Sequence, residues 1–275
     1  MEIGLSTASF YPMDTYKALK HIANFEVKTA EIFFNTFSEL ELPYISRLKS
    51  IAEENNIKIT SIHPFTSGME SFMLFSQYKA RFYDMAEYYK RYNEAANFLG
   101  AKIVVIHGDR IGAISDNEYL ERFARLMENS EREGVITAQE NVNNFRSASP
   151  QFILKMKNEI NAKFVFDIKQ SLRSGQDPYM VIDAMGENLV HVHLSDSKSV
   201  SGKNDSDAVT DNTCMLPGRG NFNFLRLFNK LNKIRYSGDI VIEVYKNSYK
   251  ELSEIKTAYK FCRNLLKTDN NMWHD

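Results

Sequence analysis

Short runs rich in β-branched residues alternate with longer amphipathic stretches along almost the whole 275-residue chain. Strands are expected at residues 3–7, 29–34, 57–63, 103–107, 135–140, 164–167, 189–194 and 239–245. The clearest helical patterns between them cover residues 38–55, 76–99 and 117–133. Gly100 and Gly134 follow two of these helices at the usual stop position, and a strand begins shortly after each. Strands that alternate with helices in this way predict a parallel β/α architecture.

Two arrangements satisfy this alternation, a closed (β/α)8 barrel and an open doubly wound sheet. An open sheet that binds a dinucleotide needs a glycine-rich turn after its first strand. Here the first strand is followed by Ala8-Ser9-Phe10-Tyr11-Pro12, which contains no glycine. The chain length is also close to the roughly 250 residues of one such barrel. We therefore predict an α/β fold, a single (β/α)8 TIM barrel, with one domain over residues 1–275.

Composition and charge limit the classes of function. The 43% hydrophobic and 25% charged residues are typical of a globular protein with a sizeable core. A formal charge of −1 gives no bulk attraction to nucleic acid. Cys214 and Cys262 are too few for a disulfide framework or a thiolate zinc site. The first ten residues lack the features of a secretory signal, and no stretch approaches the ~18 apolar residues of a membrane span. We expect a cytoplasmic protein with no membrane partner.

Metal-binding residue types recur at one place in the repeated unit, the carboxyl end of the strand. They end, or nearly end, the last six predicted strands: His63, His107, Glu140, Asp167, His193 and Glu243. In a barrel the carboxyl ends of all strands converge on one face, so these residues are expected to meet around one cavity. The least regular stretch, residues 195–221, follows the seventh strand and is expected to form a loop over the same face.

Each of these residues has another interpretation when it is taken alone. Asp167 could cap the helix that follows it, and His63 or His107 could be a hydrogen-bonded core histidine. His191 lies one layer deeper in its strand, and we assign it to packing and hydrogen bonding. Glu31 could reach the floor of the cavity or pair with a basic neighbour. The shared position of six residues nevertheless favours one polar site.

Two glutamates, one aspartate and one histidine form an oxygen-rich ligand set with one imidazole. This set suits one divalent metal ion, Mn²⁺, Mg²⁺ or Co²⁺, and Zn²⁺ also fits. A metal ion can chelate adjacent oxygens of a polyol or an α-hydroxy-carbonyl compound and polarise them. Two glutamates beside the chelated carbons could then exchange protons with the substrate. The residues thus indicate a small-molecule sugar or polyol as the substrate.

Six segments carry a resemblance to a known family, and they cover strands three to eight in the family's order. They are Ser61-Ile62-His63-Pro64, Val105-Ile106-His107-Gly108, Gln139-Glu140-Asn141-Val142-Asn143, Phe166-Asp167-Ile168-Lys169-Gln170, His191-Val192-His193-Leu194-Ser195-Asp196-Ser197-Lys198 and Ile242-Glu243-Val244. In these segments the chain resembles the xylose isomerase-like TIM barrel superfamily. That superfamily includes sugar phosphate isomerases and epimerases, and the endonuclease IV type of DNA repair enzyme.

Similarity to the ketose 3-epimerase branch has specific implications for the strand-end residues. It implies that Glu140, Asp167, His193 and Glu243 hold one divalent metal ion. It also implies that Glu140 and Glu243 are the catalytic pair that transfers protons on opposite faces of the sugar.

The resemblance further implies a set of residues that bind substrate. His63 and His107 match zinc ligands of the repair branch, and in single-metal relatives such positions contact substrate or water. Lys198 and Arg219 match basic positions that suit a phosphate or carboxylate, although both residue types are also common on solvated surfaces. Gln170 departs from the family, which usually has histidine there. Glutamine can hydrogen-bond a substrate hydroxyl but is a poor metal ligand.

The activity implied by the resemblance is that of an isomerase or epimerase of carbohydrate metabolism. It would abstract a proton next to a metal-chelated carbonyl and proceed through an enediolate. Return of the proton to the opposite face inverts that carbon, and return to the neighbouring carbon isomerises the substrate. The superfamily often forms dimers or tetramers, which leaves a homo-oligomer open.

Three alternative functions remain at this point. An inosose-type dehydratase uses similar chemistry, and a barrel that only binds a polyol shows the same pattern. An endonuclease IV-like phosphodiesterase on abasic DNA is the third. Repair enzymes need an Asp-x-His pair before strand eight, but this chain has no histidine between His193 and His274. Together with the near-neutral charge, this argues against a nucleic-acid partner.

Overall fold

The computed structural model describes residues 1–110, 112–198 and 212–272, and it confirms the predicted TIM barrel. Parallel strands pair in sequence order, and the last pairs with the first to close the barrel. The strands are β1 (Ile3–Ser6), β2 (Thr29–Phe33), β3 (Lys58–His63), β4 (Ile103–Ile106), β5 (Ile136–Glu140), β6 (Lys163–Asp167), β7 (Leu189–Leu194) and β8 (Ile240–Ile242).

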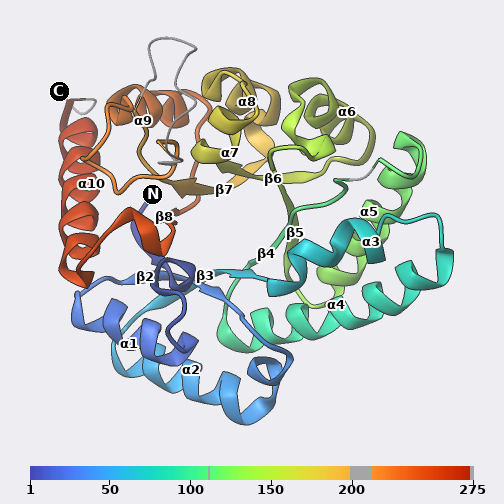
Figure 1. Cartoon of the computed structure of the whole chain (residues 1–275), viewed down its shortest axis with the longest axis horizontal. Coiled ribbons are helices and arrows are strands. Elements are labelled where there is room, and N and C mark those ends of the chain that lie inside the picture. Colours follow the sequence, from blue (N-terminus) through green and yellow to red (C-terminus); the bar gives the residue numbers. More distant parts are fainter. Residues whose placement is uncertain (111, 199–211, 273–275) are drawn as a thin grey trace.

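Helices surround the strands in chain order (Figure 1). The longer ones are α1 (Thr15–Asn24), α2 (Leu42–Glu54), α4 (Lys79–Leu99), α5 (Asp116–Arg132), α6 (Pro150–Ile160), α8 (Pro178–Met185), α9 (Phe224–Lys233) and α10 (Leu252–Met272). Two short helices lie in loops at the carboxyl ends of strands, α3 (Glu70–Met73) and α7 (Ile168–Arg173). Single 3-10 turns complete the described part, η1 (Thr7–Phe10), η2 (Phe37–Leu40), η3 (Phe65–Met69), η4 (Arg146–Ala148), η5 (Gly186–Asn188) and η6 (Lys246–Ser248).

The helices cover the barrel because their apolar residues recur at helical spacing. In α9, the buried residues are Phe224, Leu227, Phe228 and Leu231. This i, i+3, i+4, i+7 spacing places all four on one face, and they join the main hydrophobic core. Within the described residues, no helix combines the length and the apolar character that a membrane crossing requires.

The predicted helix boundaries differ from the structure mainly at one N-terminus. The stretch predicted as a helix over residues 38–55 is divided, because η2 precedes α2. The Glu39 carboxylate stabilises this turn, since it accepts hydrogen bonds from the backbone N–H of Asn35 at 2.6 Å and from the Tyr44 hydroxyl at 2.9 Å. The two predicted glycine stops are confirmed, because Gly100 and Gly134 have φ angles of 79° and 68°.

The irregular stretch over residues 195–221 follows β7 as expected, although residues 199–211 of it lie outside the described part. Its described ends are held together by the Asp196 carboxylate. This carboxylate accepts hydrogen bonds from the backbone N–H groups of Gly218, Gly220 and Phe222 at 2.9, 2.8 and 3.1 Å. Gly220 has no room for a side chain, because an added Cβ would lie 2.3 Å from the Asp196 carboxylate.

Candidate metal centre

The structure brings the four predicted ligand side chains together at the carboxyl end of the barrel. Glu140 and Asp167 end β5 and β6, His193 lies one residue before the end of β7, and Glu243 follows β8. Nδ1 of His193 lies 3.8 Å from Glu140 Oε1, 3.8 Å from Asp167 Oδ2 and 3.7 Å from Glu243 Oε2. Three carboxylate oxygens thus face one imidazole nitrogen at distances too long for hydrogen bonds.

These side chains fit a divalent metal ion. Nδ1 of His193 is buried and has no hydrogen-bond partner among the described residues, although buried polar atoms almost always have one. Ligand atoms of Glu140, Asp167 and His193 all lie within 4.8 Å of one another. An ion between the imidazole and the carboxylates would satisfy the nitrogen and offset the clustered negative charge. The donor set of oxygens with one nitrogen suits several divalent metals.

Asp167 serves the site and the helix that follows it at the same time. Its Oδ1 accepts a hydrogen bond from the Gln170 backbone N–H at 3.0 Å and caps α7, while its Oδ2 faces the centre. The Asn141 side chain fixes the strand end, because it accepts from the Asp167 N–H at 2.7 Å and donates to the Asp167 carbonyl at 3.0 Å. Capping and metal binding are therefore compatible, since each uses a different oxygen.

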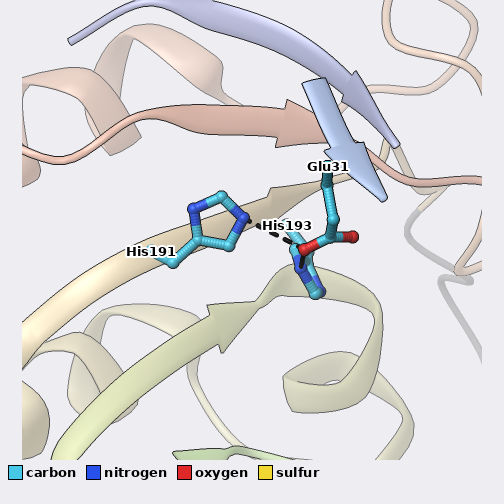
Figure 2. Close-up of side chains that lie close together, drawn as sticks. All are labelled: Glu31, His191 and His193. Atoms are coloured by element: carbon cyan, nitrogen blue, oxygen red, sulfur yellow. Dashed lines mark hydrogen bonds and ion pairs between the residues drawn. The ribbon is translucent and has the colours of Figure 1, made fainter. Parts of the chain in front are cut away.

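Glu31 on β2 points its carboxylate toward His193 and His191 on β7 (Figure 2) and so orients the histidine of the centre. Its Oε2 lies 2.9 Å from His193 Nε2 and 3.3 Å from His191 Nε2, and it accepts a hydrogen bond from Ser61 Oγ at 2.8 Å. A carboxylate accepts only, so a proton on His193 Nε2 leaves Nδ1 for the metal. Burial raises the pKa of Glu31, but the charge of His193 and the hydrogen bonds of both histidines lower it well below its usual value.

Glu31→Gln is expected to weaken Mn²⁺ binding by about 10- to 100-fold, the usual cost of losing a hydrogen-bond partner behind a metal ligand. An amide can turn its NH₂ group toward His193 and so favour the wrong tautomer. Isothermal titration calorimetry of the metal-stripped protein measures the affinity. Glu53→Gln on α2 is the matched control, because 67% of the Glu53 side chain is exposed. An unchanged affinity in Glu31→Gln would show that Glu31 does not orient the ligand.

His63 and His107 form a second group with Glu140. His107 Nε2 lies 2.9 Å from Glu140 Oε2, His63 Nε2 lies 3.6 Å from the same oxygen, and the two nitrogens are 3.1 Å apart. Glu140 therefore directs one oxygen toward His193 and the other toward this histidine pair. The ligand atoms of His63, His107 and Glu140 also lie within 4.8 Å of one another, which makes them a second metal-ligating group.

The loop that carries His107 is held from both sides. Glu70 accepts a hydrogen bond from the backbone N–H of Gly108 at 2.6 Å, and the Gln139 side chain donates to the His107 carbonyl at 2.7 Å. Gly108 has a φ of 88°, and an added Cβ would lie 2.3 Å from the Tyr119 hydroxyl. Glycine is thus required at this position for conformation and for space.

Lys169 is the residue of this centre to which the sequence pattern assigned no role. Its Nζ contacts Asp167 Oδ2 and lies 2.6 Å from Glu243 Oε2, with 3% of the side chain exposed. Burial lowers the pKa of Lys169, but the charges of Asp167 and Glu243 raise it well above its usual value. Lys169 lies in the first turn of α7, where strand periodicity does not apply. The available signal was a positive charge at a helix N-terminus, where the helix dipole disfavours it.

The remaining predicted substrate residues lie in different surroundings. Gln170 is buried, and its Oε1 accepts a hydrogen bond from the Asn143 backbone N–H at 3.1 Å. Lys198 is exposed. Arg219 forms an ion pair with Glu254 on α10, and 48% of its side chain is exposed. These contacts direct Gln170 toward the loop after β5 and Arg219 toward α10, so their contact with a substrate stays a prediction.

The ionisation of the centre predicts how metal binding depends on pH. Burial and the nearby Glu140 and Glu243 raise the pKa of Asp167 to about 6, although Lys169 opposes this. Because its pKa is raised in the folded protein, protonated Asp167 stabilises the fold at pH values below the pKa of the unfolded chain. This stabilisation is lost as the pH rises through about 6. Burial lowers the pKa of His193, but Glu31 and Glu243 raise it well above its usual value. Without metal, His193 is therefore protonated at neutral pH, and Asp167 gains a proton below pH 6.

A metal ion is expected to displace about one proton at pH 7 and about two at pH 5, because both ligands must deprotonate. Calorimetric titrations with Mn²⁺ in buffers of different ionisation enthalpy count the released protons. His21→Gln on α1 is the control, since His21 lies outside the centre. A proton release that stays constant between pH 5 and pH 7 would contradict the predicted ionisation.

Comparison with known proteins agrees with this architecture. The family model described as "Xylose isomerase-like TIM barrel" matches residues 19–265. An uncharacterized protein of Methanocaldococcus jannaschii is 24% identical over 259 residues, which cover 88% of this chain and 83% of the relative. A D-tagatose 3-epimerase-like protein of known structure has a TM-score of 0.79 at 20% identity, with 99% of each chain covered. D-psicose 3-epimerase from Clostridium cellulolyticum H10 has a TM-score of 0.76 at 18% identity, covering 97% of this chain and 99% of the other. At these identities the structural similarity shows the fold.

Proposed function

Because the chain belongs to the xylose isomerase-like TIM barrel family, we propose that it is a divalent-metal-dependent isomerase or epimerase of a sugar, sugar phosphate or polyol. The observation that carries this proposal is the convergence of Glu140, Asp167 and Glu243 on the unpartnered Nδ1 of His193. A metal-chelating site with two glutamates beside it suits proton transfer next to a carbonyl group.

The two glutamates approach the centre from different sides. Glu140 ends β5 and Glu243 follows β8, so two strands of the closed barrel separate them. A bound metal ion supplies Lewis acidity that polarises a chelated carbonyl oxygen. One glutamate removes the proton from the carbon next to the carbonyl, and the other returns a proton. Return to the opposite face of that carbon inverts it, whereas return to the adjacent carbon isomerises the substrate.

The histidine pair is proposed to bind the substrate. The Nε2 atoms of His63 and His107 face Glu140, so they lie beside one member of the proton-transferring pair. A substrate hydroxyl could take the place that Glu140 Oε2 occupies beside His107 Nε2. Two structures similar to this chain are named as 3-epimerases or 3-epimerase-like proteins, and these names support a ketose as the substrate class.

Incubation with a panel of ketoses and polyols in D₂O tests the proposal. The protein is stripped of metal, supplied with Mn²⁺ and followed by NMR and mass spectrometry. We expect deuterium at a carbon next to a carbonyl group in at least one panel member, together with an epimer or isomer of it. A product that has lost water would favour a dehydratase instead. Absence of both exchange and product with every member would contradict the proposed function.

A further inference from the structure

We propose that Lys169 is a resident counter-cation of the metal centre. It holds the ligand carboxylates together without metal, and it weakens metal binding because it competes for two of their oxygens. This inference rests on the metal-binding part of the proposed function. It concerns a residue that is neither a predicted ligand nor a predicted proton-transfer group.

The position of Lys169 puts it in direct competition with a metal ion. Its Nζ contacts Asp167 Oδ2 and lies 2.6 Å from Glu243 Oε2. These two oxygens are also the ones that face His193 Nδ1 at 3.8 and 3.7 Å. An ion that binds His193 must therefore share both oxygens with the ammonium group or displace it from them.

The ammonium group remains near the centre when it is displaced. Only 3% of the Lys169 side chain is exposed, and Nζ lies 5.7 Å from the centroid of the Tyr245 ring. That ring is held in turn, because the Arg173 guanidinium donates to the Tyr245 hydroxyl at 3.0 Å. Lys58 is much more exposed than Lys169. It pairs with Asp239 at 2.6 Å at the opposite end of the barrel, and 65% of its side chain is exposed.

The formal charges show why the lysine lowers the affinity. Once His193 has released its proton to bind metal, Glu140, Asp167 and Glu243 carry three negative charges, and Lys169 reduces the sum to −2. A divalent ion then meets a site of charge −2 instead of −3, with a second positive charge close to it. Repulsion between two positive charges at such a distance is strong in a buried site, because the effective dielectric constant is low. The same positive charge limits the repulsion among the carboxylates when no metal is bound.

Replacing the charge of Lys169 tests the inference. Lys169→Met and Lys169→Gln are compared with the wild type and with Lys58→Met as the matched control. Calorimetric titration of Mn²⁺ into the metal-stripped proteins measures affinity, and thermal unfolding is followed in EDTA and in saturating Mn²⁺. We expect both Lys169 variants to bind Mn²⁺ at least tenfold more tightly than the wild type. We also expect both Lys169 variants to have a lower Tm than the wild type in EDTA and a larger rise of Tm on adding Mn²⁺. Lys58→Met should show none of these differences from the wild type.

The possible outcomes separate this inference from the proposed function. Wild-type binding with equal or weaker binding by both variants would overturn the counter-cation role and leave the metal centre intact. Absence of Mn²⁺ binding by every protein would overturn both. Binding by the variants alone would support the inference. Variants that fold only with Mn²⁺ would also support the inference. Variants that misfold even with Mn²⁺ would overturn it, because a metal ion then cannot replace the lysine.

Discussion

Glu243→Gln is expected to lower the turnover number by about 10²- to 10⁴-fold, the usual contribution of a positioned proton-transfer group. The amide keeps the size of the side chain but cannot accept the proton. The kcat on the ketose that exchanges most rapidly in D₂O measures the effect. Glu53→Gln should keep the wild-type rate, because its side chain is exposed on α2. A kcat for Glu243→Gln within tenfold of the wild type would exclude Glu243 from proton transfer.

Metal binding must be measured for the same variant, because Glu243 also faces His193 and contacts Lys169. Assays at saturating Mn²⁺ separate the two roles. If Glu243 only held the ion, excess metal would restore the rate. We expect the loss to persist at saturation, because proton transfer needs the carboxylate itself.

His193→Gln is expected to weaken Mn²⁺ binding at least 100-fold, the largest effect on metal affinity among these variants. Loss of a residue that only hydrogen-bonds to a metal ligand is expected to weaken binding less, by about 10- to 100-fold. His193 contributes the imidazole that the three carboxylates face. Its loss also leaves the Glu31 carboxylate with one fewer buried partner, which costs stability of about 1–3 kcal/mol. Calorimetry with Mn²⁺ measures the affinity, and thermal unfolding measures the stability.

The control for this variant is His21→Gln, which removes a histidine of α1 away from the strand ends. It should leave the Mn²⁺ affinity unchanged. If His193→Gln bound Mn²⁺ as tightly as the control, the ion would lie elsewhere. The group of His63, His107 and Glu140 would then be the first place to look.

The barrel and the meeting of the strand-end residues could be predicted from the sequence for one physical reason. Parallel strands in a barrel direct their carboxyl ends to one face, so a residue's position within the repeated unit fixes its place in the fold. This rule alone was enough to place Glu140, Asp167 and His193 at the carboxyl end of the barrel. Glu243 needed one more step, because β8 ends at Ile242 and the residue lies just beyond the strand.

Lys169 and Glu31 could not be assigned in the same way. Lys169 lies in the first turn of a short helix, and its contact with Glu243 joins residues that are 74 positions apart. Glu31 had two open interpretations, and the choice between them depended on the depth of His191 and His193 in the barrel. The ion pair of Arg219 with Glu254 likewise depends on how α10 packs against the loop after β7.

Diffraction from crystals soaked in Mn²⁺, with anomalous scattering to locate the ion, shows directly which side chains hold the metal. We expect one ion in direct contact with His193 Nδ1 and with the carboxylates of Glu140, Asp167 and Glu243. An ion bound only by His63, His107 and Glu140, or no ion at the carboxyl end of the barrel, would contradict this expectation.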